Sequence, residues 1–218
     1  MKTAILASYY VDAMNFASTE ETRFYLRGAL LEPGGLIVAT DGHTMFAANA
    51  AHDPDAFRSE LPEDRIIPFH KPLLAACKAK SKSKLPRFLV IEHGPAGSLS
   101  FTARVISGNL EDVLAPTPVA VEFTWEGCFI DGTFPDWRRV LPVMPDEPCT
   151  ETPAFNARYL ARFSEVAGNA GKYGGAIRVV PTGKGTPALV DLGREDAFGV
   201  IIPFRWDTPR GIPAWVKR

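Results

Sequence analysis

The feature that most restricts the fold is a series of short runs of apolar, aromatic and β-branched residues, separated by turns rich in Gly, Pro, Asn and Asp. Such runs between turn residues are typical of β-strands. The expected strands are residues 22–31, 35–39, 44–50, 65–69, 88–92, 98–103, 119–126, 176–180, 188–192 and 198–203. The Glu-Pro-Gly-Gly turn that follows the first run predicts a β-hairpin with a four-residue loop.

Helical periodicity is confined to three short segments, residues 5–16, 71–80 and 156–166. Residues 52–64 are rich in Pro and Asp and are expected to form a loop. Because strands outnumber helices, the sequence predicts an α+β fold built from antiparallel sheets with short helices.

Composition excludes several protein classes. The chain has 218 residues, 46% hydrophobic and 22% charged, which is typical of soluble globular proteins and not of disordered or fibrous ones. The formal net charge of -1 argues against a surface that binds polyanions everywhere, so any nucleic-acid contact must be regional.

Cysteine usage and hydropathy indicate the compartment. Cys77, Cys128 and Cys149 are odd in number and form no C-x-x-C pair, which disfavours a disulfide framework and a zinc module and indicates a reducing environment. No apolar stretch approaches the length of a membrane span. We therefore expect a cytoplasmic protein that does not associate with membranes.

The common catalytic motifs are absent: there is no G-x-x-x-x-G-K-[ST], G-x-S-x-G or H-E-x-x-H pattern. His43, His52, His70 and His93 never stand three or four residues apart, so we predict no metal site, no cofactor and no catalytic residues. Asp41 and His43 could form an acid/base pair. The sequence favours the simpler interpretation, an Asp-Gly turn that is fixed by its own carboxylate.

Basic residues gather in two places. The second expected helix and the loop after it carry a run of Lys with no acidic residue before Arg87, and the third helix region is also basic. Arg158 and Arg162 stand four apart and are expected to share one helical face. The candidate DNA-facing residues are Lys71, Lys78, Lys80, Lys82, Lys84, Arg158, Arg162 and Lys172. A solvated lysine-rich surface is the alternative interpretation of the same pattern.

Four ordered segments resemble one known family. Residues 21–46 (ETRFYLRGALLEPGGLIVATDGHTMF) and 131–142 (DGTFPDWRRVLP) are similar to the second domain of the bacterial DNA polymerase III beta sliding clamp, which carries "V-A-T-D-G-H-R-L" and "D-G-[KR]-F-P-D-Y-R-R-V-L-P". Residues 155–167 (FNARYLARFSEVA) and 199–205 (GVIIPFR) resemble segments of the third domain of that family.

The resemblance implies a DNA-clamp-like fold of about one and a half clamp domains. Residues 1–142 look like the complete second domain, and residues 143–218 look like the second half of the third domain plus a short tail. The boundary falls in the segment 142–153, where Pro142, Pro145, Pro148 and Pro153 resist regular structure. Nothing in the sequence resembles the first domain, which contributes to ring closure in the family.

In the family, a groove between the second and third domains binds short linear peptides of polymerases and repair proteins. The resemblance places this groove at Leu26, Thr40, Gly42, His43, Thr44, Met45, Pro135, Arg139, Val140, Val200, Ile202, Pro203, Phe204 and Arg205. Thr44 stands where the family has arginine, and Phe204 stands where it has methionine. These two differences predict a less cationic and less pliable pocket.

The leading hypothesis is a non-enzymatic, sliding-clamp-like replication factor of a bacterium, phage or mobile element. It would bind clamp-binding peptides in this groove, contact duplex DNA weakly and without sequence preference, and could form a homo-oligomer. Two alternatives stay open at this stage. One is an open decoy or adaptor that antagonises the host clamp, and the other is a small-ligand enzyme with a cleft at Asp41, His43 and Arg139.

Overall fold

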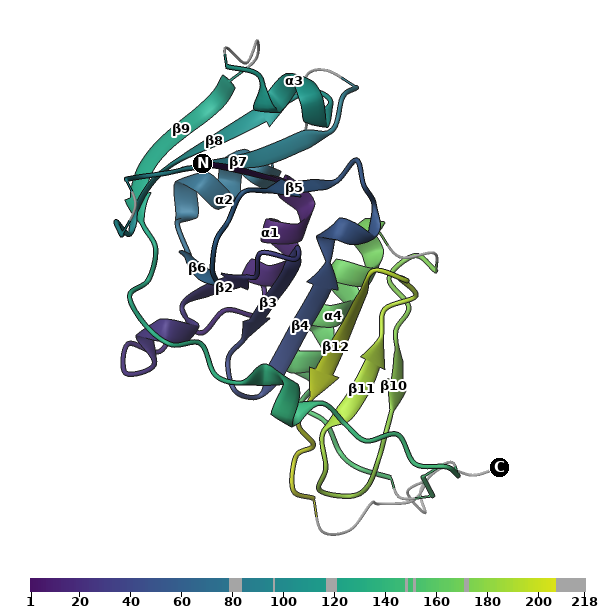
Figure 1. Cartoon of the computed structure of the whole chain (residues 1–218). Coiled ribbons are helices and arrows are strands. Elements are labelled where there is room, and N and C mark those ends of the chain that lie inside the picture. The colour runs from purple at the N-terminus through teal and green to yellow at the C-terminus, as the bar shows by residue number, and fades with distance from the viewer. Residues whose placement is uncertain are drawn as a thin grey trace.

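The computed structural model describes residues 1–78, 84–95, 97–116, 121–147, 149–150, 152–170 and 173–206. Two antiparallel sheets dominate the fold (Figure 1). The first has five strands in the order β5-β1-β7-β8-β9, and the second has seven in the order β10-β11-β12-β4-β3-β2-β6. The predicted α+β class with antiparallel sheets and short helices is confirmed.

The strands are β1 (Lys2–Leu6), β2 (Gly28–Leu31), β3 (Leu36–Thr40), β4 (Thr44–Asn49), β5 (Phe57–Ser59), β6 (Arg65–Pro68), β7 (Arg87–His93), β8 (Ser100–Ser107), β9 (Val121–Cys128), β10 (Arg178–Val180), β11 (Ala188–Asp191) and β12 (Ala197–Ile201). The α-helices are α1 (Ala7–Met14), α2 (Lys71–Lys78), α3 (Leu110–Leu114) and α4 (Ala157–Ala170). Three short 3-10 helices complete the set: η1 (Phe24–Leu26), η2 (Ala50–His52) and η3 (Trp137–Val140).

The first expected helix is partly wrong. Residues 2–6 form strand β1, and helix α1 begins only at Ala7. β1 lies between β5 and β7, so Thr3, Ala4 and Ile5 are all fully buried. A strand that is buried on both faces is continuously apolar instead of alternating, and periodicity cannot separate such a run from the start of a helix.

Three smaller differences also have local causes. β5 lies in the segment expected to be a loop, and its three residues are a strand only because they pair with β1. The five-residue helix α3 is too short to carry a periodic signal. In the first expected strand, residues 24–26 form η1, and the strand begins at Gly28. The hairpin of β2 and β3 is confirmed.

Pairing of β12 with β4 joins the C-terminal part of the chain to the N-terminal part in one sheet. In this register Val200 lies opposite Met45, and Ile201 lies opposite Thr44. Strands from both sides of residue 142 therefore share the seven-stranded sheet, with β10, β11 and β12 continuing it beyond β4 (Figure 1). The division of the chain at residue 142 into two clamp-like units stays a prediction.

Helix α4 packs on this sheet through a position that only glycine fits. A Cβ on Gly199 of β12 would lie 2.2 Å from the ring of Phe163 in α4, well inside van der Waals contact. The missing side chain lets the Phe163 ring approach the strand closely, and this ring is fully buried. Phe163 then meets Phe16 at 4.8 Å between ring centroids, and Phe16 meets Phe46 of β4 at 5.6 Å.

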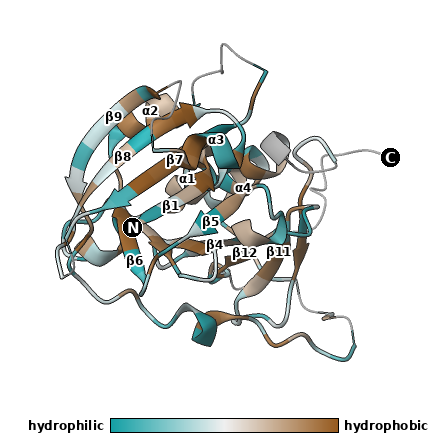
Figure 2. Cartoon of the chain, turned by 45° about the horizontal axis from the view of Figure 1, so that its top comes forward, coloured by the Kyte–Doolittle hydropathy of each residue, from teal (hydrophilic) through white to brown (hydrophobic). Residues whose placement is uncertain are grey.

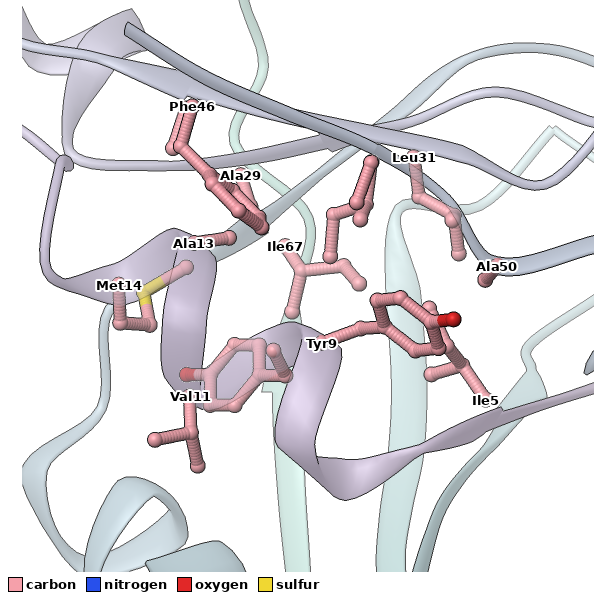
Figure 3. Close-up of a cluster of buried hydrophobic side chains, with 14 of the residues drawn as sticks. Ile5, Tyr9, Val11, Ala13, Met14, Ala29, Leu31, Phe46, Ala50 and Ile67 are labelled. Atoms are coloured by element: carbon pink, nitrogen blue, oxygen red, sulfur yellow. The ribbon is translucent and has the colours of Figure 1, made fainter. Parts of the chain in front are cut away.

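The main core lies between the sheets and helix α1. Side chains of α1, including Tyr9 and Met14, meet Ile5 of β1, Phe46 of β4 and Ile67 of β6 in one buried cluster (Figure 3). Central strands such as β7 are strongly hydrophobic, whereas the edge strand β9 also carries hydrophilic positions (Figure 2). Among the described residues, no helix has both the length and the apolar character that crossing a membrane requires.

A buried ionic network connects α1 to the turn between β11 and β12. Arg194 is 5% exposed and donates to Asp12 of α1 at 2.7 Å and to both carboxylate oxygens of Asp196. Tyr9 of α1 donates its hydroxyl proton to Asp196 at 2.7 Å. The network fixes the C-terminal strands against the first helix.

Removal of the Arg194 guanidinium should destabilise the fold. Arg194→Met leaves Asp12, which is 1% exposed, without its buried cation, and this should lower the free energy of unfolding by about 3 kcal/mol in urea titrations. Arg178→Met is the matched control, because Arg178 is exposed and forms no ion pair in the part of the chain that the structure describes. Equal losses in the two variants would contradict a stabilising role of the network.

Acid should also weaken the network. Burial by itself would raise the pKa of Asp196, but hydrogen bonds from Arg194 and Tyr9 outweigh it and hold this pKa below its ordinary value. A lowered folded-state pKa adds stability that is present above about pH 4 and is lost as the pH falls through the folded-state value. Unfolding free energies of the wild type should therefore fall more steeply than those of Asp196→Asn between about pH 5 and pH 2. Parallel curves would show that the carboxylate contributes nothing.

Candidate functional site

A groove of about 220 Å³ opens where β12 pairs with β4. Four separate parts of the chain line it: the region of η1, the turn between β3 and β4, the segment that contains η3, and the β11–β12 region. The lining residues are Arg23, Tyr25, Leu26, Thr40, Gly42, His43, Thr44, Met45, Pro135, Asp136, Trp137, Val140, Pro187, Val200 and Ile202.

Most of the residues that the sequence assigns to a groove lie in this one site. Those that line it are Leu26, Thr40, Gly42, His43, Thr44, Met45, Pro135, Val140, Val200 and Ile202. Arg139, Pro203, Phe204 and Arg205 are not among the lining residues. Phe204 instead forms an isolated bridge with Ala154 and is 58% exposed.

The floor of the groove is apolar and closely packed, while its rim is open. Met45, Trp137 and Val200 are buried together in one cluster with Leu30, Val38, Ala47 and Ile66. At the rim, Val140 is 44% exposed and Ile202 is 42% exposed. The site is therefore a solvent-open slot with an apolar lining, which can desolvate apolar side chains of a ligand.

The turn between β3 and β4 is rigid because the carboxylate of Asp41 holds it. One oxygen of Asp41 accepts hydrogen bonds from the backbone N–H groups of His43 and Thr44, both at 2.8 Å, and from the Thr44 hydroxyl at 3.1 Å. The other oxygen accepts from Arg162 of α4 at 2.6 Å. Burial would raise the pKa of Asp41, but these donors outweigh it, so the pKa lies below its ordinary value.

Helix α4 and strand β12 fix the same turn from the other side. The ring of His43 stacks on Tyr159 of α4 with 5.4 Å between centroids. The backbone N–H of Ile202 donates to the carbonyl oxygen of His43 at 2.9 Å. The groove walls therefore come from distant parts of the sequence and are tied to one another.

This geometry gives no support to an enzymatic cleft at Asp41, His43 and Arg139. Asp41 uses both of its oxygens to hold the turn and the Arg162 guanidinium, and Arg139 is exposed and does not line the groove. In the described ranges, no group of three His, Cys, Asp or Glu residues has an arrangement that could hold a metal ion.

Sequence reasoning missed five lining residues: Arg23, Tyr25, Asp136, Trp137 and Pro187. Asp136 and Trp137 follow Pro135 directly within a segment that was recognised, so an apolar aromatic residue between Pro135 and Val140 was a usable signal. No signal in the sequence pointed to Pro187, because this residue reaches the groove only through the pairing of β11 with β12.

The candidate DNA-facing residues fall into three groups. Lys71, Lys78, Lys84 and Arg158 are exposed. Arg162 is directed to Asp41 instead of sharing an exposed face with Arg158. Lys80, Lys82 and Lys172 lie outside the described residues.

Helices α1, α2 and α4 border one further hollow of about 690 Å³, where Lys78 and Arg87 lie with Asp12 and Glu165. Arg87 pairs with Glu122 at 2.6 Å, and Asp12 pairs with Arg194. The helical side of the molecule therefore carries charges of both signs.

Comparison with known proteins identifies relatives of this arrangement, although no family model matches the chain. The beta sliding clamp of Pseudomonas aeruginosa is 32% identical over 137 residues, which is 61% of this chain and 30% of the relative. That of Escherichia coli K12 is 27% identical over 141 residues, 63% of this chain and 32% of the relative. The chain thus spans about a third of the length of the curated relatives it matches.

Solved structures of sliding clamps match this chain over more of its length. The sliding clamp of Bartonella birtlesii, solved with bound griselimycin, superposes with a TM-score of 0.58 at 18% identity, over 94% of this chain and 66% of the clamp. The clamp of C. crescentus gives a TM-score of 0.57 at 17% identity, over 94% and 65%. The predicted resemblance is therefore confirmed: this chain has the fold of the bacterial DNA polymerase III beta sliding clamp family and is related to its members in sequence.

Proposed function

We propose that the chain is a non-enzymatic, sliding-clamp-like protein whose groove binds short linear peptides of replication or repair proteins. The observation that carries this proposal is the open apolar slot at the β4–β12 junction, with Met45 and Val200 in its floor and Ile202 at its rim. The relation to beta sliding clamps supports the same class of partner.

The size and lining of the groove suit two or three apolar side chains of an extended segment. Each such side chain contributes about 1.5 to 3 kcal/mol when it leaves water. The cost of ordering a flexible peptide offsets much of this gain. Three side chains at the upper end of this range give about 9 kcal/mol. The expected affinity is therefore micromolar or weaker, which corresponds to about 8 kcal/mol of binding free energy or less.

Thr44 and Arg23 do not add a free cation to this apolar groove. Thr44, where the family has arginine, is 2% exposed and bonded to Asp41, so it presents no cation to a ligand. Arg23 also lines the groove, but its guanidinium pairs with Glu20 at 2.7 Å. Apolar contact therefore dominates the proposed recognition.

Substitution of two exposed rim residues tests the groove. Val140→Glu and Ile202→Glu each place a charge in the apolar slot, where a bound peptide would desolvate it. Each change should weaken binding at least tenfold, about 1.4 kcal/mol, in fluorescence anisotropy with a labelled peptide from the clamp-binding segment of a bacterial replicative polymerase.

Val121→Glu is the control, because Val121 has the same 44% exposure as Val140 but lies on β9 in the other sheet. Both rim positions are already exposed, so far-UV circular dichroism should show the folded spectrum for all three variants. Wild-type affinity in the two groove variants would refute the assignment of the groove.

Contact with duplex DNA is the weaker part of the proposal. Lys71, Lys78, Lys84 and Arg158 supply exposed cations near α2 and α4, but Glu165 lies in the same hollow as Lys78. Few phosphate contacts give weak, sequence-independent binding that salt removes.

Self-association is the second part of the proposal. Within the described residues, β5 and β9 end the five-stranded sheet, and β10 and β6 end the seven-stranded one. Unpaired strand edges readily pair with another chain. Because of these strand edges, the proposal includes a homo-oligomer.

The mass of the protein in solution and its retention on DNA test self-association and DNA contact together. We expect light scattering at micromolar concentration to give a mass above that of one chain, and raising the salt from about 50 to 200 mM to release the protein from linear duplex. Retention on closed circular duplex alone at the higher salt would identify a ring. A single-chain mass without such retention would contradict self-association and favour an open form that only captures peptides.

A further inference from the structure

The outer wall of the groove is a strap, residues 130–140, that follows β9 and belongs to no sheet. In Figure 1 it is the teal segment that passes the lower ends of β4 and β12. It supplies Pro135, Asp136, Trp137 and Val140 to the groove. Its backbone bonds to a neighbouring strand at Ile130, whose N–H donates to the carbonyl oxygen of Ile66 at 3.0 Å.

Space lies behind the strap as well as in front of it. A second hollow, of about 350 Å³, adjoins its other side, and Pro135, Asp136 and Trp137 border both spaces. Packing holds the strap at Trp137, which is buried in one cluster with Met45 and Val200. Because hollows adjoin the strap on both sides of this ring, polar contacts of Trp137 and its neighbour Arg138 also bear on its position.

The carboxylate of Glu32 makes those contacts. Glu32 lies directly after β2, is 14% exposed and lines the second hollow but not the groove. One oxygen accepts from the indole N–H of Trp137 at 3.1 Å and from Arg138 at 2.9 Å, and the other accepts from Arg138 at 2.8 Å. The Arg138 guanidinium also lies 4.3 Å from the centroid of the Trp137 ring.

These contacts hold Glu32, Trp137 and Arg138 together more firmly than a simple surface ion pair would. A bidentate Arg–carboxylate pair fixes orientation as well as distance. Trp137 is 7% exposed, so its N–H would lose its acceptor inside the protein if the carboxylate were removed. Hydrogen bonds from Arg138 hold the pKa of Glu32 below its ordinary value, which is consistent with a charged carboxylate in this position.

We propose that Glu32 is a positioning residue for the groove: from outside the groove it holds Trp137 and Arg138, and through them sets the place of the wall against which a peptide binds. The inference rests on the proposed peptide-binding function of the groove. It assigns to Glu32 an effect on affinity without any contact between Glu32 and the ligand.

Glu32→Gln tests this in the full chain with two readouts. The amide oxygen can still accept from Trp137, but the charge that binds Arg138 is gone. The first readout is hydrogen exchange in and directly after the strap, where the backbone N–H groups of Arg139 and Leu141 donate to the carbonyl oxygens of Asp136 and Arg138. These amides should exchange about tenfold faster, while those of β4 and β12 should not change.

The second readout is the affinity for the labelled peptide, which should fall about fivefold to tenfold since the partly exposed pair is screened by solvent. Glu63→Gln is the matched control: it removes the nearby ion pair with Arg65, and Glu63 lines neither the groove nor the second hollow. Its exchange rates and affinity should equal those of the wild type.

A double variant separates positioning from general destabilisation. If Glu32 acts through Arg138, Glu32→Gln combined with Arg138→Gln should weaken affinity no more than the worse of the two single changes. Additive losses, unchanged strap exchange in Glu32→Gln, or faster exchange without loss of affinity would each overturn the inference.

The two proposals fail in different ways. If the wild type does not bind the peptide at all, the proposed function is wrong. Strap exchange in Glu32→Gln then still decides whether Glu32 holds the wall, and unchanged exchange refutes it. If the wild type binds and only Glu32→Gln behaves like the control, the function stands and the positioning role is wrong.

Discussion

The pairing of β12 with β4 is the interaction on which the rest of the structure depends. It joins segments about 150 residues apart in one sheet and places Val200 beside Met45 in a fixed register. A shift of β12 by one residue would turn Val200 to the opposite face of the sheet, while the pairing of β4 with β3 would keep Met45 in place. The apolar floor of the groove exists only in this register. The buried Arg194 network and the Phe163 ring over Gly199 secure it from two directions.

The groove walls have less support from the sheets and more from individual polar side chains. Asp41 holds the turn on one wall and Glu32 holds the strap on the other, and each carboxylate binds an arginine and at least one N–H group. In the proposed peptide-binding function, apolar surface would supply the binding energy, and the carboxylates of Asp41 and Glu32 would set the shape of the groove. A groove built this way can stay open to solvent without collapsing.

Local chemistry explains what could be predicted from the sequence. The Thr40–Thr44 turn and the hairpin of β2 and β3 lie in short motifs whose residues act on their neighbours. The groove residues were assigned through the resemblance to the sliding clamp family, not through local chemistry. The strand β1, the short β5 and the groove residue Pro187 could not be found this way, because pairing with distant strands creates each of them. Arg162 illustrates the same limit: its spacing from Arg158 predicts a shared face, but Asp41 lies within its reach.

The most direct test of the account is a methyl NMR experiment on the complex with the peptide. With Met and Ile methyl groups labelled, intermolecular NOEs should connect one apolar peptide side chain to both Met45 and Ile202, since these residues line the same slot from β4 and from the end of β12. NOEs to both would show that one ligand bridges the two parts of the chain. NOEs to Met1, which is 54% exposed and directly precedes β1 of the five-stranded sheet, with none to Met45 or Ile202, would contradict the account.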